Sequence, residues 1–454
     1  MSDHQSRCLT VDELASLVRQ GAIDTVALAV VDLYGRPKGK RLNAAPFLER
    51  LPAGAEMCDY VLATDYAMTP LPGFDLAGWH NGFGDLRIVP ELHTIRRLIY
   101  DPGTVMVFGT ALHHDGQPVD VAPRQMLQRQ IDRLAKHGHQ ARIGVESEAF
   151  FFKGSPERVR SRGFQQLAPV FPHNADYALD HSPALVEFFD EIRSAVRRAG
   201  ARVEAIKTEG APGQVEVTWP HTDPMSACDN YTVYKHAVRH VAARNRMTPT
   251  FMAAPYTGLA SGLHLHVSLW RDGAPVFDTD SAQDMPEPLH LALAGSIAAL
   301  PHLVPLYAPT ENSFLRYRPH SFAPVNYTYG IDNRTTAFRV AGHGEHTRIE
   351  TRLAGADANI YNAVAAVLAG FVYGLDHQPK LPAPCSGDAY KERDAPCVPR
   401  NLEEALLDFR ESTLAGEALT DPVVAHYARA AEVEIAAGQG QVPGWQRERG
   451  FLHA

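Results

Sequence analysis

Residues 143–152 read Ile-Gly-Val-Glu-Ser-Glu-Ala-Phe-Phe-Phe, an apolar run interrupted by two carboxylates and one serine. This composition predicts a β-strand. Because side chains alternate between faces along a strand, Glu146 and Glu148 are expected to point the same way. Two like charges at that spacing repel, so a cation is expected opposite them, and hard divalent ions such as Mg2+ and Mn2+ prefer oxygen ligands. A sheet whose second face is wet is the alternative for this stretch taken alone.

The composition is that of a soluble globular protein of two or three domains, or of one small and one large domain. The chain has 454 residues, of which 45% are hydrophobic and 21% charged. Its net charge of -9, with no dense basic run, argues against a nucleic-acid partner. A polar N-terminus and the lack of an apolar span of about 18 residues predict neither export nor a membrane anchor. Five scattered cysteines without a C-x-x-C pair indicate reduced thiols in a cytoplasm.

Local signals divide the chain near residue 110. A capping box at Thr10 and Glu13 predicts a helix that runs to Gly21, and two β-rich segments, 25–32 and 38–42, predict a hairpin with Asp32 at its end. Pro and Gly at irregular intervals then indicate a small mixed domain.

Beyond it, helices are expected in a larger unit, where they would back a sheet. They are predicted over 123–138, 183–200 and 224–245, and near 401 and 421.

Further polar groups share one strand face or one turn. Glu209 and Glu216 lie on either side of a Pro-Gly turn and can converge on one point. Alternation over 262–269 puts two histidines and a serine on one face, and alternation over 348–353 does the same for two arginines and a glutamate. These residues are His264, His266, Ser268, Arg348, Glu350 and Arg352.

Several arginines lie close together in the sequence, where guanidinium forks can hold carboxylate and phosphate oxygens. They are Arg316, Arg318, Arg334 and Arg339. With the glutamates and histidines they suit two neighbouring divalent ions with phosphate between them. Neither G-x-x-x-x-G-K-[ST] nor G-x-G-x-x-G occurs, so a nucleotide would be held through metals and arginines.

The order of these motifs resembles the glutamine synthetase family along nearly the whole chain. Glu146-Ser-Glu148 looks like the family's G-x-E-x-E strand, and residues 209–216 look like its E-x-x-x-G-Q-x-E segment. Other matching segments are 261–266 (S-G-M-H-x-H), 312–316 (N-S-Y-K-R), 333–334 (N-R), 348–352 (R-I-E-x-R) and 401–406 in the tail.

The resemblance implies an α+β fold in two domains: an N-terminal β-grasp domain, residues 1–110, and a large catalytic domain on curved antiparallel strands, residues 111–454. It also implies a homo-oligomer, a dodecamer of two stacked hexameric rings with sites between subunits. The implied cofactors are Mg2+ or Mn2+, two or more per site, with ATP as co-substrate and glutamate and an amine as partners.

The resemblance also implies a role for each matching residue. One metal ion is assigned to Glu148, Glu209 and Glu216, and the second to Glu146, His264 and Glu350. Arg316 and Arg352 are assigned to the acid substrate, and Arg334 and Arg339 to the transferring phosphoryl group. His266, Ser268 and Arg348 are assigned to the nucleotide. The ammonium or amine site is assigned to Glu209, Tyr177 and Asp32, the last lent by a neighbouring subunit.

Two departures from true glutamine synthetases concern specificity. The family's flap reads P-G-Y-E-A-P, but Phe322 stands here where that glutamate belongs, and an apolar ring cannot hold NH4+. Leu259 and Ala260 replace the Asn-Gly that helps to hold the amino acid, which puts the exact acid substrate in question. The aromatic flap resembles the γ-glutamyl amine ligases of amine catabolism, and the N-terminal half looks like the branch acting on ethanolamine and small alkylamines.

Three functions are therefore weighed. The first is an ATP-dependent ligase that joins glutamate to a primary amine, such as ethanolamine, a small alkylamine or a polyamine, through γ-glutamyl phosphate. The second is an ammonium-using glutamine synthetase, which Phe322 argues against. The third is a non-catalytic assembly protein on the same fold, which would predict decay of the metal ligands, yet all six are present.

Overall fold

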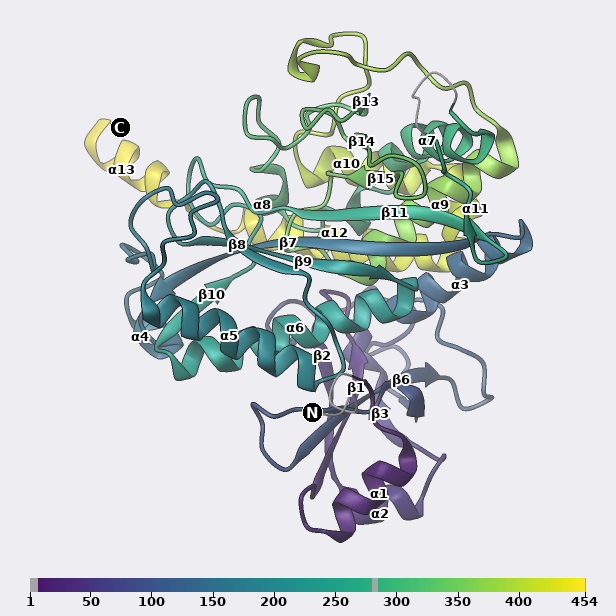
Figure 1. Ribbon diagram of the computed structural model, residues 1–454, viewed down its shortest axis with the longest axis vertical. Coiled ribbons are helices and arrows are strands. Elements are labelled where there is room, and N and C mark those ends of the chain that lie inside the picture. Colours follow the sequence, from purple (N-terminus) through teal and green to yellow (C-terminus); the bar gives the residue numbers. More distant parts are fainter. Residues whose placement is uncertain (1–6, 280–284, 454) are drawn as a thin grey trace.

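Two sheets organise the chain, one small and N-terminal, the other large and crossing the middle of the molecule (Figure 1). The structure is a computed structural model that describes residues 7–279 and 285–453. Both sheets are associated with helices, so the fold mixes α and β elements as expected.

The small sheet has the strand order β2-β1-β6-β4-β3, with β5 (Arg96–Arg97) beside β6. The pair β1–β6 is parallel and its neighbours are antiparallel. Its strands are β1 (Thr25–Val31), β2 (Pro37–Asn43), β3 (Ala55–Cys58), β4 (Asp85–Pro90) and β6 (Thr104–Leu112). The predicted capping box is present at the start of α1 (Val11–Arg19), and α2 (Ala44–Glu49) packs on it. The predicted hairpin is confirmed by the antiparallel pairing of β1 and β2.

The large sheet has the order β13-β14-β15-β11-β7-β9-β8, with β10 (Met247–Thr250) beside β7 and β12 (Ala274–Pro275) beside β11. Its pairs are antiparallel except for β13–β14. The other strands are β7 (Gln140–Lys153), β8 (Ala205–Thr208), β9 (Gln214–Thr222), β11 (Leu263–Arg271), β13 (Tyr329–Ile331), β14 (Phe338–Ala341) and β15 (Arg348–Thr351). The strand predicted over 143–152 is therefore the long central strand β7.

Helices pack behind this sheet and continue the apolar core. Two of them, α3 (Pro123–Lys136) and α6 (Pro224–Arg244), contact β7 directly, and α5 (Pro183–Arg198) packs on α6. These match the three helices predicted from Pro and capping residues. Proline suits the first helical turn because its missing N–H has no partner there, and Ser182 and Asp223 accept hydrogen bonds from the first turns of α5 and α6.

One largely buried helix, α9 (Ile360–His377), was not foreseen. It is apolar on all sides and packs against α7 (Glu287–Ala299) and α3, so it lacks the periodicity that marks an amphipathic helix. The remaining helices are α4 (Pro156–Ser161), α8 (Glu311–Phe314), α10 (Leu402–Glu411), α11 (Thr413–Leu419), α12 (Asp421–Gln439) and α13 (Gly444–His453). Within residues 7–279 and 285–453, no helix is long and apolar enough to cross a membrane.

Candidate active site

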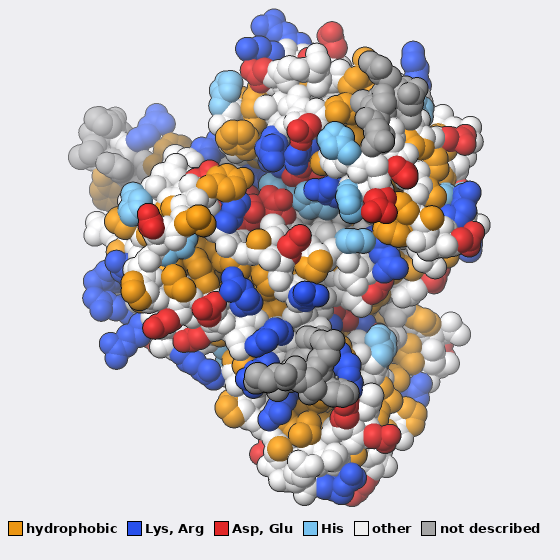
Figure 2. Space-filling view, viewed as in Figure 1, with side chains coloured by type: hydrophobic (Ala, Val, Ile, Leu, Met, Phe, Trp, Pro, Cys, Tyr) orange, Lys and Arg blue, Asp and Glu red, His pale blue; other side chains and the backbone are white. Residues whose placement is uncertain are grey.

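Strand register brings the predicted residues together across five neighbouring strands of the large sheet. Glu146 on β7 lies opposite His264 on β11, and Glu350 on β15 lies opposite His266. On the other side of β7, Glu148 lies opposite Glu216 on β9. Glu216 in turn lies opposite Lys207 on β8. Figure 2 shows acidic and histidine side chains gathered in a hollow over the large sheet.

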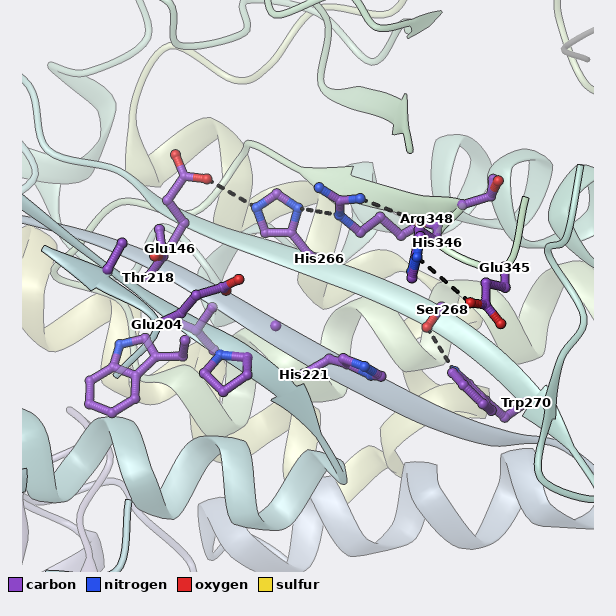
Figure 3. Close-up of a pocket in the computed structure, with 16 residues that line it drawn as sticks. Glu146, Glu204, Thr218, His221, His266, Ser268, Trp270, Glu345, His346 and Arg348 are labelled. Carbon is purple, nitrogen blue, oxygen red and sulfur yellow. Dashed lines mark hydrogen bonds and ion pairs between the residues drawn. The ribbon is translucent and has the colours of Figure 1, made fainter. Parts of the chain in front are cut away.

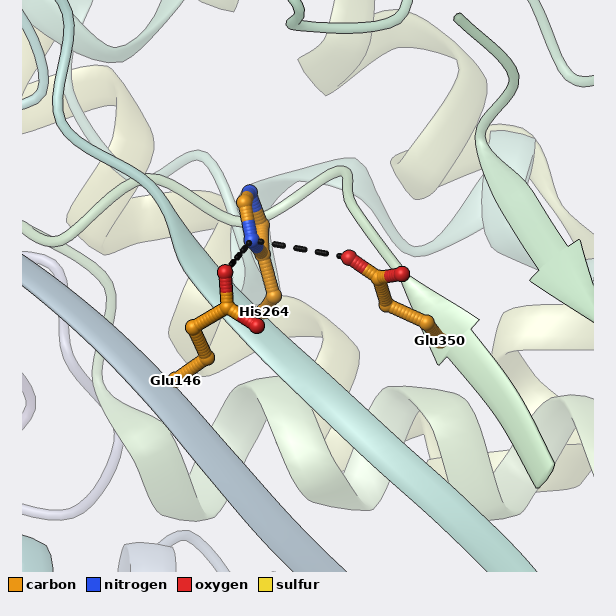
Figure 4. Close-up of side chains that lie close together, drawn as sticks. All are labelled: Glu146, His264 and Glu350. Carbon is orange, nitrogen blue, oxygen red and sulfur yellow. Dashed lines mark hydrogen bonds and ion pairs between the residues drawn. The ribbon is translucent and has the colours of Figure 1, made fainter. Parts of the chain in front are cut away.

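One end of this row, the imidazole end, consists of Glu146, His264 and Glu350. His264 Nδ1 lies 3.1 Å from Glu146 Oε1 and 3.7 Å from Glu350 Oε1, and Figure 4 shows the imidazole between the two carboxylates. One potential ligand atom from each residue lies within 4.8 Å of the other two. In the part of the chain that the structure describes, no other group of three such residues is this compact. Carboxylate oxygens with one imidazole suit Mn2+ or Mg2+, so these residues fit the ion that the sequence assigned to them.

Arginines and histidines offset the buried charge at the imidazole end. Glu350 is 1% exposed, and its carboxylate contacts Arg339 at 2.7 Å and also Arg352. Burial opposes its ionisation, but Arg352, His264 and His266 outweigh burial and lower the pKa of Glu350 to about 2. Burial also opposes the charge on Glu146, yet hydrogen bonds with His264 and His266 lower its pKa. Both carboxylates are therefore anionic at neutral pH.

The other end, the lysine end, consists of Lys207, Glu209 and Glu216. Lys207 Nζ forms a short ion pair with Glu209 and lies 3.9 Å from Glu216 Oε1. Burial and the negative charge of Glu146 raise the pKa of Glu216. Burial opposes the charge on Lys207, but its contacts with Glu209 and Glu216 raise the pKa of its ammonium group. The negative charge of these carboxylates is therefore partly neutralised by Lys207, a residue that the sequence analysis did not single out.

Glu148 lies between the two ends and is already hydrogen-bonded. Its Oε2 accepts from Gln214 Nε2 and from the backbone N–H of Gly262, both at 2.8 Å. An added Cβ at Gly262 would lie 3.2 Å from the other oxygen of Glu148 and 2.6 Å from His264 Nε2, so glycine is needed for this close approach. Glu148 and Glu216 thus lie on the paired strands β7 and β9, and Glu209 directly follows β8, but the oxygens of these three residues do not form a group as compact as the imidazole end.

A cavity of about 670 Å³ opens beside the imidazole end and is lined by all three residues predicted to face the nucleotide (Figure 3). His266 lies 3.0 Å from Glu146 on one side and accepts a 3.2 Å hydrogen bond from Arg348 Nε on the other. Ser268 Oγ accepts a hydrogen bond from Trp270 Nε1 at 2.9 Å.

The cavity wall includes residues that sequence reasoning missed. The rings of His221 and Trp270 stack with centroids 5.9 Å apart, and Glu204 and His346 also line the wall. Strand alternation beyond Ser268 predicts that Trp270 shares the face of the two histidines, so this residue could have been found. His221, at the far end of β9, carried no comparable signal.

The four arginines assigned to the acid substrate and the phosphoryl group comprise three buried or half-buried residues and one exposed residue. Arg316 is buried, donates to the carbonyls of Leu353 and Arg352 at 3.0 Å, and lies 3.4 Å from His264 Nε2. Arg352 joins Glu350 to the flap, since it also donates to the carbonyl of Phe322 at 3.3 Å. Arg339 bridges Glu350 and Asp332, and Arg334 is exposed on the neighbouring turn.

Tyr177 and Phe322 are both largely exposed, 72% and 64%, and both have positive φ angles, 55° and 59°. Tyr177 covers the lysine end, with Lys207 Nζ 4.5 Å from its ring centroid. Asp32 lies elsewhere in the same chain: it is buried at the end of the β1–β2 hairpin, where its carboxylate accepts hydrogen bonds from Tyr34 and Arg36. None of these contacts joins Asp32 to Glu209 or Tyr177.

Comparison with known proteins identifies the class. Residues 120–450 match the glutamine synthetase catalytic domain. The chain is 39% identical to gamma-glutamylethanolamide synthetase GlnA4 of Streptomyces coelicolor, over 98% of this chain and 96% of that protein. It is 30% identical to glutamate–isopropylamine ligase of a Pseudomonas species, over 96% and 97%. A solved GmaS/ADP complex has a TM-score of 0.82 at 25% identity and covers 96% of this chain and 98% of that one.

The chain belongs to the glutamine synthetase family. Within it, the relatives place the chain in the γ-glutamyl amine branch, as the motifs and Phe322 predicted.

Proposed function

We propose that this protein is an ATP-dependent ligase that joins the γ-carboxylate of glutamate to a primary amine through γ-glutamyl phosphate, in amine catabolism. The observation that carries the proposal is the compact carboxylate–imidazole group, which contacts buried arginines through His264 and Glu350 and borders the 670 Å³ cavity through Glu146. This order suits glutamate at the arginines and ATP in the cavity, with the reacting groups meeting at the carboxylates.

The metal-binding residues are proposed as the sequence assigned them. Glu146, His264 and Glu350 would hold one divalent ion, and Glu148, Glu209 and Glu216 the other. When bound, Mg2+ or Mn2+ neutralises the charge that develops on the transferring phosphoryl group. Burial of Glu350 and His264 supports this role, because buried carboxylates need fixed cationic partners.

The arginines bind and orient the two anionic substrates. Arg316 and Arg352 would hold the carboxylate of glutamate, since a guanidinium fork matches two carboxylate oxygens. The γ-carboxylate oxygen attacks the terminal phosphorus of ATP, the bond to ADP breaks, and Arg334 and Arg339 stabilise the phosphoryl oxygens. The ammonium group gives one proton to Glu209 or Asp32, the freed amine nitrogen attacks the acyl carbon, phosphate leaves, and the nitrogen passes its second proton to solvent to give the neutral amide. His266, Ser268 and Arg348 would orient the nucleotide.

The amine site is proposed at Tyr177, Glu209 and an Asp32 lent by a neighbouring subunit. Glu209 and Asp32 supply negative charge for the ammonium head, and Phe322 offers apolar surface to a carbon chain. Relatives named for an ethanolamide and for isopropylamine support a small primary amine. Glu209 supports both the amine and one metal ion, so we assign it to the junction of the two sites.

The assembly and its setting are part of the proposal. Residues 1–110 would form a β-grasp domain and residues 111–454 the catalytic domain, which agrees with the separate small sheet. Two stacked hexameric rings would let the buried hairpin of one subunit complete the site of the next. We place the enzyme in the cytoplasm.

A screen of amines tests the proposal. Phosphate release from ATP is measured with glutamate and, in turn, ammonium, ethanolamine, short alkylamines, putrescine and spermidine. We expect a primary amine to give the highest kcat/KM. Equal or better use of ammonium would identify a glutamine synthetase instead, and no turnover with any amine or ammonium would favour the non-catalytic assembly protein.

A further inference from the structure

Lys207 is a cation within the carboxylate row, placed by strand register. It lies directly opposite Glu216 in the pairing of β8 and β9, and Glu209 follows it by two residues, just beyond the end of β8. Its Nζ contacts Glu209, lies 3.4 Å from Asp176 Oδ1 and 3.9 Å from Glu216 Oε1, and lies 4.5 Å from the ring centroid of Tyr177. With a side chain 24% exposed, it is partly withdrawn from water.

The ammonium group uses the same oxygens that a divalent ion needs. A metal ion coordinates carboxylate oxygens at about 2.0–2.6 Å, so an ion on Glu209 and Glu216 would lie within a few ångströms of Nζ. Repulsion between cations at such distances is strong in a partly buried site. The lysine must therefore withdraw from Glu209 before the ion is fully bound.

The structure also provides a place for the withdrawn ammonium group. Asp176 and the face of Tyr177 already contact Nζ, and together they offer a carboxylate and a cation–π contact that do not depend on Glu209 or Glu216. A four-carbon stem can move between the two positions without backbone change.

We propose that Lys207 is a resident cation that competes with the divalent ion for Glu209 and Glu216 and so sets the metal affinity of the lysine end. This inference rests on the proposed function, because it takes Glu209 and Glu216 as metal ligands. It assigns to the lysine end an ion whose binding is opposed by a mobile side-chain cation on its own ligands.

Mn2+ binding to the metal-stripped full-length enzyme tests the inference, with free Mn2+ followed by electron paramagnetic resonance in the absence of substrates. The Glu216→Gln variant is measured first, and the class of Mn2+ sites that is lost in this variant is assigned to the lysine end. For that class, Lys207→Met should bind Mn2+ about tenfold tighter or more, because one positive charge is gone. Lys207→Arg keeps the charge and should stay within about twofold of wild type. Lys153→Met, at an exposed lysine on β7, is the matched control.

Each outcome separates the two ideas. If Glu216→Gln removes a class but Lys207→Met binds Mn2+ no tighter there, the competition is wrong while the metal site stands. If Glu216→Gln removes no class, the assignment of Glu216 to a metal is wrong and the competition falls with it. Lys207→Gln, measured in parallel, provides the same readout if the Met variant does not assemble.

Discussion

The imidazole end and the lysine end lie on one sheet face but balance their charges differently. At the imidazole end, Arg339, Arg352 and two histidines surround Glu350 and Glu146. At the lysine end, a single flexible lysine faces Glu209 and Glu216. The difference teaches that arginines balance the buried charge at the imidazole end, whereas at the lysine end, under our proposal, a divalent ion would have to replace a lysine.

The largest effect expected is loss of the ion at the lysine end. Glu216→Ala and Glu148→Ala should each remove nearly all turnover, about a thousandfold in kcat, because each deletes a ligand of the same proposed ion. Size-exclusion chromatography should show the oligomer still assembled. Full phosphate release in either variant, or by wild type in excess chelator, would contradict the two-ion proposal.

The next largest effect is a difference in folding stability between variants at the two ends. Glu350→Gln should lower kcat about a hundredfold and also destabilise the fold by about 3–5 kcal/mol, because it leaves Arg352 buried without its anion. Glu216→Gln should cost little stability, since it removes a carboxylate that Glu146 repels. Thermal unfolding of the metal-free protein measures the loss of stability in each of the two variants. The surface variant Glu404→Gln is the control, and equal destabilisation by the two glutamine variants at Glu350 and Glu216 would remove the distinction between the ends.

A smaller effect is expected at the arginine that joins the imidazole end to the flap. Arg352→Lys keeps the charge but loses the planar fork, so the KM for glutamate should rise about tenfold or more. Initial rates over a glutamate series at saturating ATP and amine provide the measurement. An unchanged KM would mean that this strand face does not bind the acid substrate. Arg400→Lys, in a surface pair with Glu404, controls for nonspecific effects.

The smallest effect concerns the flap. Phe322→Glu restores a carboxylate that can bind a small ammonium ion, so the ratio of kcat/KM for the best amine to that for ammonium should fall several-fold. Only a partial change is expected because Leu259 and Ala260 remain. Phe322→Leu, which keeps an apolar side chain, is the matched control. If the Glu and Leu variants have the same ratio of kcat/KM for the best amine to kcat/KM for ammonium, Phe322 does not select the amine.

Local patterns in the sequence were sufficient for much of the fold. Alternation identified β7, β11 and β15, and capping residues with Pro identified α1, α3, α5 and α6, because these signals depend on neighbours within a few residues. The same alternation placed Glu146, Glu148, His264, His266 and Glu350 on strand faces. The family motifs then predicted the class that the comparisons confirmed.

Long-range packing decided the rest. Strand register sets Glu146 against His264 and Glu148 against Glu216. Both pairs join segments more than 50 residues apart, and no local pattern specifies them. The pairing of β8 with β9 then sets Glu216 against Lys207. The uniformly apolar helix α9 was likewise not predicted, because its position depends on the helices that pack around it. Sequence alone therefore determined which residues carry charge and which strand face they occupy. The tertiary structure decided which charges meet, because electrostatic interaction depends on distance in space and on burial, not on separation along the chain.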